Sequence, residues 1–399
     1  MQAKNTLRLA IQAAAATTAL GVATQASAVD LNISEDVDAS LYGYAQMNMS
    51  YDFDGDNAAT TRAGSFSTLD EDDDDGHFGA DVYQSRLGVK VDHASGVSVT
   101  VEGDFRGGEG GDFRMRHAFG EYKGFLAGRT WSNYNSFVGA TPTLDFDTLA
   151  GTPGLQDRTE QLRYTTGPVS FSVEDSVRGP NIADGSGPDL DTRKSAPVLT
   201  ARIEDSAGSI SYSAAGLVKR ISADGRAQSA SLNPDGTTST TPGSDVDDNA
   251  MGYGVFGAMT IDLTDMLAVH GVVNYTDGAN SYLYRSGNNF YGTSAYVDGG
   301  DIETIQGYGG SLGTSLDLGN GNSINLGYGI TKLDLDDAVD DGAMTNAAAE
   351  KNQNVMLNYQ MTPVDNVMVG VEYGYFKQET KGGDSTDANR LIFATRYSF

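Results

Sequence analysis

The last ten residues of the chain alternate between the two faces of an extended strand, one largely apolar and one carrying both arginines, and this pattern constrains the fold more strongly than any other feature. One face of an extended strand would carry Leu391, Phe393, Thr395, Tyr397 and Phe399. The opposite face would carry Arg390, Ile392, Ala394, Arg396 and Ser398. Successive side chains of a strand point to opposite faces. Such a strand is typical of the last strand of a membrane-spanning β-barrel, although a soluble sheet can end in the same way.

Residues 1–28 are predicted to form a cleaved export signal. Lys4 and Arg8 give it a charged start, 9–23 is a stretch of small and apolar residues, and 26–28 is an Ala-Ser-Ala cleavage site. The apolar stretch is shorter than the ~20 residues of a membrane-spanning helix, which disfavours an anchoring helix. Cleavage would leave residues 29–399 as one barrel domain and would make the formal net charge of −28 more negative by two.

The composition excludes several classes of protein. The chain has no Cys, so disulfide frameworks and thiolate chemistry are absent. From residue 29 onward no window holds 18 uncharged apolar residues, which argues against a helical membrane protein. A barrel fits the modest mean hydropathy of −0.34, because every second strand residue faces water. No Pro-rich or Ser-rich linker divides the chain, which favours one domain.

Sixteen segments combine strand alternation with turn signals, and they predict an all-β, transmembrane antiparallel barrel. The segments are 37–53, 81–93, 97–106, 112–122, 125–131, 160–165, 169–177, 196–204, 209–219, 252–263, 267–276, 303–318, 323–335, 354–361, 367–376 and 390–399. Short turns alternate with long polar loops, as at the two rims of an outer-membrane barrel. Sixteen strands leave a water-filled channel. No repeat of fixed period appears, so the remaining soluble alternative is a large β-sandwich or secreted adhesin.

Alternation also predicts which cationic side chains point into the lumen of such a barrel. They are Arg86, Lys90, Arg106, Arg114, Arg116, Arg163, Arg202, Arg390 and Arg396. The first and last strands of a closed barrel are neighbours, so several of these side chains would gather on one wall. Arginines in a pore select anions and bind carboxylates through paired hydrogen bonds. Alternatively, they pair with lumenal Glu102, Asp104 and Glu204 and stiffen the barrel.

The loop 132–156 is less charged than the other long loops and is predicted to fold into the barrel. It carries Phe137, Leu144, Phe146, Leu149 and Leu155, which are costly to expose to water. Folded inward as a constriction, it would place Asp145, Phe146 and Asp147 opposite the arginine wall. The alternative is a surface loop buried in an oligomer interface.

Other candidate sites in the sequence are weak. The acidic run 70–75 offers oxygen ligands for Ca²⁺ or Mg²⁺, but it lacks the spacing of a built site and is better explained as a solvated loop. None of the four histidines lies in an H-E-x-x-H pattern. The negative charge disfavours a nucleic-acid partner. We therefore expect no catalysis, no cofactor and no metal site.

Two stretches resemble the fourth and fifth strands of the DcaP-like porins, which are outer-membrane channels linked to uptake of dicarboxylic acids and other small anions. They are 112–122, with Arg114-Met-Arg-His-Ala118, and 125–134, with Gly128-Arg-Thr-Trp-Ser-Asn133. The dipeptides Asp145-Phe146 and Pro153-Gly154 resemble the inward loop of that family.

The resemblance implies a homotrimer of 16-stranded barrels in the outer membrane of a Gram-negative bacterium. By that analogy the pores prefer small anions, and Arg114, Arg116 and Arg129 lie near the constriction. Some members carry an N-terminal coiled coil, but only 29–38 precedes the first strand here, which is too short for one. The alternatives are a cation-preferring general porin and a non-conducting surface barrel.

Overall fold

The computed structural model describes residues 29–54, 60–69, 76–108, 110–152, 158–176, 181–183, 190–232, 238–285 and 292–399. The predicted export signal 1–28, the acidic run 70–75 and residues 153–157 lie outside the described residues.

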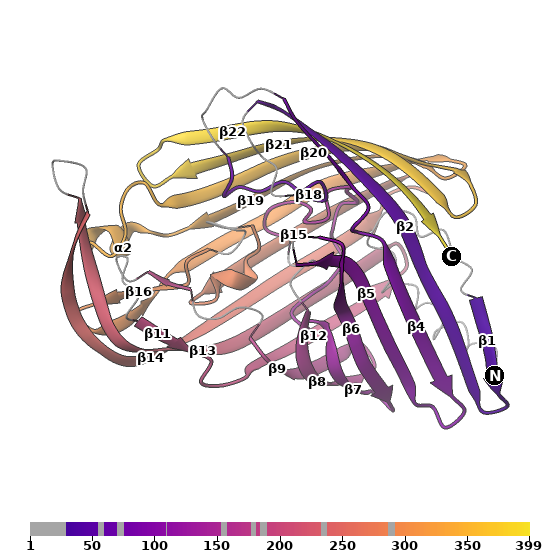
Figure 1. The fold of residues 1–399 in the computed structure, drawn as a ribbon, viewed down its shortest axis with the longest axis horizontal. Helices are drawn as coiled ribbons and strands as arrows, with labels where there is room; N and C mark the ends of the chain where they lie inside the picture. Colours follow the sequence, from indigo (N-terminus) through magenta and orange to yellow (C-terminus); the bar gives the residue numbers. More distant parts are fainter. Residues whose placement is uncertain are drawn as a thin grey trace.

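Within these described ranges, sixteen antiparallel strands form a closed barrel, as predicted (Figure 1). They are β2 (Val37–Asp54), β4 (Arg86–His93), β5 (Ser98–Gly107), β6 (Asp112–Tyr122), β7 (Phe125–Trp131), β8 (Arg158–Thr166), β9 (Val169–Glu174), β12 (Val198–Ala207), β13 (Ile210–Leu232), β14 (Thr238–Asp262), β15 (Leu267–Asp277), β18 (Gln306–Gly319), β19 (Asn322–Leu333), β20 (Ala349–Val364), β21 (Val367–Thr380) and β22 (Ser385–Ser398). Each strand pairs with the next in this order.

The barrel closes where β22 pairs with β2, from Tyr44 opposite Ser398 to Asp54 opposite Asn389. At the end of this seam, the backbone N–H and C=O groups of Gly43 and Phe399 exchange two hydrogen bonds, of 3.1 and 3.0 Å. The seam leaves no open sheet edge, which a strand structure in lipid requires.

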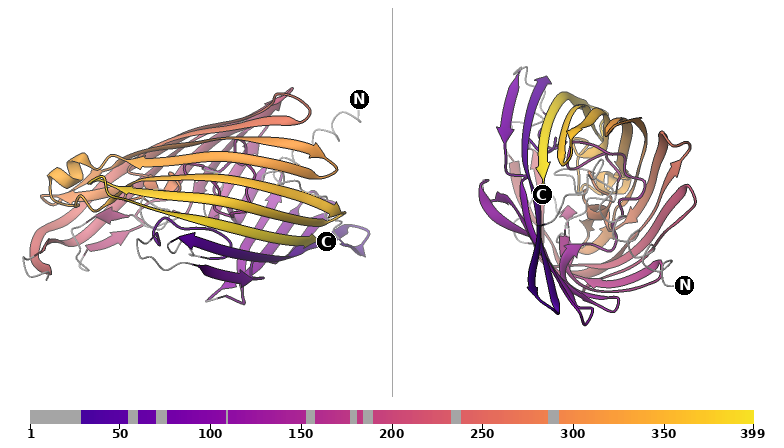
Figure 2. Two further views of the ribbon diagram at one scale, coloured as in Figure 1. Left: turned by 90° about the horizontal axis from the view of Figure 1, so that it is seen from above. Right: turned by 90° about the vertical axis from the view of Figure 1, so that its right-hand side faces the viewer.

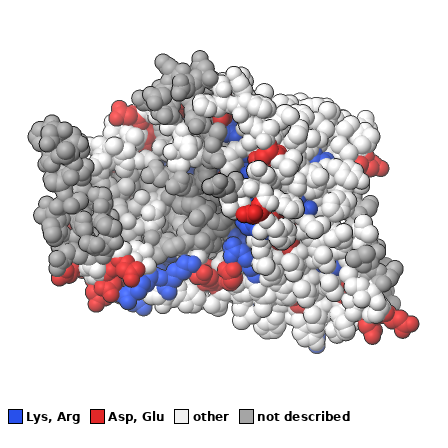
Figure 3. All heavy atoms as spheres, viewed as in Figure 1, with Lys and Arg blue, Asp and Glu red and all other residues white. Residues whose placement is uncertain are grey.

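The wall is apolar outside and polar inside because of the strand alternation. On β9, for example, Phe171 and Val173 are half exposed on the outer face, whereas Ser170 and Ser172 are buried on the inner face. Figure 3 shows one outer face, where uncharged surface predominates between scattered acidic and basic side chains. Among the described residues, no helix is long and apolar enough to cross a membrane.

Short segments outside the barrel strands line the rims and enter the lumen (Figure 2). β1 (Val29–Ser34) and β3 (His77–Asp81) both pair with β2. β10 (Ile182–Ala183), β16 (Ala295–Asp298) and β17 (Asp301–Thr304) form a small separate sheet. The remaining ones are β11 (Leu190–Arg193), η2 (Asn280–Tyr282) and α2 (Asp336–Asp340).

Candidate functional site

The loop after β7 lies inside the barrel, as predicted, and wall carboxylates hold it there. We call its described residues, 132–152, the inward loop. At its start, the backbone N–H of Asn133 donates to Glu174 over 2.6 Å. On the opposite wall, Glu372 accepts hydrogen bonds from the backbone N–H groups of Leu144, over 2.8 Å, and of Asp145, over 2.7 Å. These contacts stretch the loop across the lumen from β9 to β21.

The acidic residues of the inward loop are paired with arginines from two other loops. Asp145 is buried and lies 3.2 Å from Nη2 of Arg285, and Asp147 lies 3.7 Å from Nη2 of Arg62. Burial alone would lower the pKa of Arg285. The neighbouring carboxylates of Asp145 and Asp147 outweigh this effect, so the pKa of Arg285 is raised. Asp145 and Asp147 thus pair with loop arginines and not with the strand arginines that were predicted to face them. The three loops meet at this junction.

Phe146 is the inward-loop residue that does meet the arginine wall. Its ring centroid lies 4.3 Å from Cζ of Arg62, 5.5 Å from Cζ of Arg116 and 5.8 Å from Cζ of Arg86. A guanidinium within about 6 Å of an aromatic face is attracted to it. The ring therefore lies against three cationic groups inside the lumen.

Strands β4, β5 and β6 supply the arginine wall and two carboxylates. Arg114 binds Asp104 through two parallel hydrogen bonds of 3.0 and 2.8 Å. Arg116 is almost fully buried and contacts Glu102 at 3.0 Å and Asp104 at 2.8 Å. Arg86 lies 3.6 Å from Glu102. Three guanidinium groups thus share two carboxylates, which leaves an excess of one positive charge on this wall.

Other predicted lumenal cations form ion pairs with carboxylates other than Glu102 and Asp104, as in the stiffening alternative. Arg106 lies 3.0 Å from Asp81, Arg390 lies 3.4 Å from Asp52, and Arg202 lies 3.9 Å from Glu204. Lys90 is exposed near the turn after β4 and pairs with Asp92 at 3.0 Å. These residues line the wall without joining the Phe146 cluster.

Arg163 and Arg396 are inward-facing arginines for which no ion pair occurs among the described residues. Arg163 donates to Oε1 of Gln161 over 2.9 Å and to the carbonyl oxygen of Trp131 over 2.5 Å. Cζ of Arg396 lies 5.3 Å from the ring centroid of Tyr44. Both therefore add positive charge to the inner face of the wall without a direct ion pair among the described residues.

Arg129 faces outward, so the position implied by the resemblance needs correction. The strand register places Arg129 between Ala118 of β6 and Glu160 of β8. Its Nη1 lies 2.7 Å from Oε1 of Glu160, whose side chain is 61% exposed. A β-bulge at Arg116 in β6 shifts the alternation of the following residues, which explains why Ala118 and its partner lie outside.

Sequence reasoning missed Arg62, Arg285 and Glu372. The two arginines lie in loops, where alternation gives no information about direction. Glu372 does alternate inward on β21, but its role depends on the backbone N–H groups of Leu144 and Asp145, whose position the alternation does not predict. The available signal was an acidic residue on the inner face of the predicted segment 367–376, which carries no other charge.

The sequence comparisons find no match: no protein-family model fits the chain, and no curated protein matches it. Among solved structures, the outer-membrane channel DcaP of Acinetobacter baumannii is similar, with 27% identity and a TM-score of 0.74. The alignment covers 92% of this chain and 99% of that channel. This chain has a DcaP-like porin fold. The porin is thus a channel protein of the outer membrane of a Gram-negative bacterium.

More distant structures share the barrel fold alone. The anion-selective porin from Comamonas acidovorans is 14% identical, with a TM-score of 0.53 over 91% of this chain and all of the other. The trimer form of OmpT from Vibrio cholerae is 13% identical, with a TM-score of 0.52 over 92% of this chain and all of the other.

Proposed function

We propose that this porin lets small hydrophilic anions, and dicarboxylates in particular, diffuse passively through an arginine-lined pore. The observation that carries the proposal is the arginine wall of β4, β5 and β6, where Arg86, Arg114 and Arg116 outnumber Glu102 and Asp104. Fixed positive charge at a narrow place raises the local concentration of anions and lowers that of cations. Paired N–H donors also match the oxygens of a carboxylate.

A reversal-potential measurement in planar bilayers under a salt gradient tests this proposal. We expect anion preference in the wild type and a shift toward cations in Arg114→Gln and Arg396→Gln. The matched control is Arg193→Gln, because Arg193 is exposed on β11 and pairs with Asp224. Cation preference in the wild type would support a general cation-preferring porin, which the formal net charge of −28 favours. No conductance at all would support a non-conducting surface barrel.

The outer wall around β7 and β8 supports a homotrimer. Arg129 and Glu160 form an ion pair on the outward face of these strands. A charged side chain on the lipid face costs about 2–4 kcal/mol near the middle of the bilayer. Contact with a second copy would remove the pair from lipid, so we propose this wall as the subunit interface. We also propose that residues 1–28 are removed on export, and that the porin needs neither a cofactor nor catalysis.

A further inference from the structure

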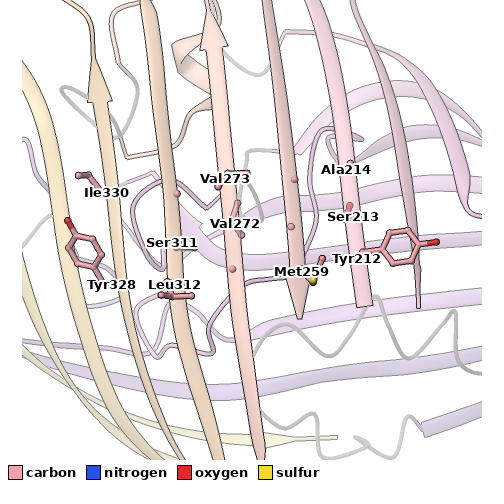
Figure 4. A pocket seen from close by; sticks show the side chains of 14 residues that line it. Tyr212, Ser213, Ala214, Met259, Val272, Val273, Ser311, Leu312, Tyr328 and Ile330 are labelled. Atoms are coloured by element: carbon pink, nitrogen blue, oxygen red, sulfur yellow. The ribbon is translucent and has the colours of Figure 1, made fainter. Parts of the chain in front are cut away.

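Five neighbouring strands, β13, β14, β15, β18 and β19, leave an apolar groove of about 830 Å³ on the outer wall (Figure 4). Its floor is low because Gly257, Gly271 and Gly310 replace larger outward-facing side chains. Its edges are high because Val273 and Leu312 are 70% and 63% exposed. The groove is therefore a recess in a surface that faces the hydrocarbon of the membrane.

The strand register gives the groove a direction. Tyr212, Met259, Gly271, Leu312 and Tyr328 are successive partners across the five strands, and Figure 4 shows the four labelled ones in a row. Four strand spacings of ~4.8 Å make the row about 19 Å long. Tyr212 is the third residue of β13 after a short turn, whereas Tyr328 is the seventh of β19. The groove thus rises obliquely from the short-turn rim toward the middle of the wall.

The rim below the groove is acidic. Three short turns lie at this rim, between β12 and β13, β14 and β15, and β18 and β19. They contain or adjoin Asp205, Asp262, Asp265 and Asp317. The segments 203–213, 260–270 and 314–325 contain no Lys or Arg. Short turns mark the periplasmic side of an outer-membrane barrel. A lipid whose headgroup carries only negative charge is repelled there, whereas an ammonium group is attracted.

We propose that the groove binds one acyl chain of a phospholipid in the periplasmic leaflet, with a headgroup that carries a primary amine. The length of the groove suits one chain lying obliquely in a leaflet, since half of the hydrocarbon core is about 15 Å thick. A second protein copy is a poor fit. A specific interface needs roughly 800 Å² from each partner, and a recess only about 19 Å long offers far less than that area. The groove is also separated from the proposed subunit interface on β7 and β8 by β9 and β12.

The glycines allow the groove to be filled without disturbing the barrel. A Cβ atom added at Gly271 would meet nothing within 4 Å, and one at Gly257 would lie 3.8 Å from Cγ2 of Val273. Gly271→Leu and Gly257→Leu therefore place apolar atoms in the groove. The matched control is Gly216→Leu on β13, where an added Cβ meets Gly254 O at 3.8 Å, an ordinary contact outside the groove.

The test measures immobilised lipid by electron paramagnetic resonance, with the purified porin in bilayers that contain a chain-labelled phosphatidylethanolamine or phosphatidylglycerol. We expect the wild type to prefer phosphatidylethanolamine. We also expect Gly271→Leu and Gly257→Leu to immobilise about one chain fewer per protomer and to lose that preference, with Gly216→Leu unchanged.

Three results would overturn the proposal. The first is equal immobilisation of both lipids by the wild type, which needs no variant. The second is an unchanged count in both groove variants. The third is a change of oligomeric state in these variants with no change in lipid, which would make the groove a protein interface. Conductance does not depend on the groove, so a failure of the proposed anion preference would be seen separately.

Discussion

Arg285 and Asp145 lie 140 residues apart in the sequence and form a buried ion pair, with 3.2 Å between Nη2 and Oδ1. Arg285 also donates to the carbonyl oxygen of Gly64 over 3.0 Å. The backbone N–H of Gly64 in turn donates to Asp145 over 2.8 Å. Three loops are therefore tied together at one point of the lumen.

Replacing Arg285 by Gln should destabilise this junction by about 3–5 kcal/mol at neutral pH, because one partner of a buried pair is lost. Burial raises the pKa of Asp145, and Arg285 is the main group that opposes this, so the pKa should rise further in the variant. A carboxyl with a raised pKa stabilises the fold below its unfolded-state pKa of ~3.9, and this stability is lost as pH rises through the folded-state value.

Thermal unfolding in detergent between pH 4 and pH 8 checks this prediction. The deficit of Arg285→Gln relative to the wild type should grow as the pH rises. Arg193→Gln, which removes an exposed partner, should show a small deficit at every pH. A deficit that is constant or larger in acid would contradict the assigned role of Asp145.

Asp104→Asn should increase anion preference, in contrast to Arg114→Gln. Asp104 accepts hydrogen bonds from both Arg114 and Arg116, so its neutralisation leaves more positive charge on the arginine wall. The reversal potential should move in opposite directions in the two variants. Asp92→Asn, at an exposed pair with Lys90, serves as the control. Shifts of the same sign in both would show that this wall does not set selectivity.

Phe146→Ala should raise single-channel conductance, because the side chain occupies space among three guanidinium groups. The loss of a buried Phe should also cost about 3 kcal/mol of stability. Phe137→Ala is the comparison within the same loop, since Phe137 packs on Trp131. Conductance that rises equally in both variants would mean general loosening of the inward loop.

Glu372→Gln should loosen the inward loop. The N–H groups of Leu144 and Asp145 donate to different carboxylate oxygens, and an amide nitrogen in place of one oxygen cannot accept, so one N–H loses its partner. A buried unsatisfied group costs about 1–3 kcal/mol. We expect more current noise in single-channel recordings. Glu379→Gln on the same strand is the control, because Glu379 pairs with Lys351 and Lys377 at the surface. Equal noise in both variants would argue against the anchoring role.

Ala127→Trp should disrupt a trimer that uses the wall of β7 and β8. Ala127 is exposed on the outer face and lies next to the Arg129–Glu160 pair in the sheet. Ala201→Trp on β12, also exposed, is the control. Light scattering of the detergent complex measures the mass, and an intact trimer in Ala127→Trp would place the interface elsewhere.

The strands could be predicted from the sequence because lipid and water impose a strict alternation on the wall. All sixteen predicted segments overlap barrel strands. The extent of the strands was less predictable. β13 and β14 continue to Leu232 and from Thr238, well beyond the predicted segments 209–219 and 252–263, and Ile221, Ala223 and Val246 of this extension are buried in an apolar cluster that the sequence does not reveal.

The site was predictable only in part, for two physical reasons. Side-chain direction in loops depends on tertiary contacts, so Arg62 and Arg285 gave no signal. A single bulge inverts the alternation, and a motif carries no information on register. The predicted Arg116 does lie beside Phe146, and the predicted Arg114 binds Asp104 on the same wall, whereas Arg129 from the same resemblance lies outside.

The contact between Gly43 and Phe399 joins positions 356 residues apart in the sequence. Gly43 lies in the first barrel strand, and Phe399 directly follows the last. No partial set of strands can satisfy both edges, so closure must wait until β22 has been delivered. Shortening β22 should leave the first and last strands exposed together. Until β22 pairs with β2, the two edge strands of the sheet stay open to pairing with other chains.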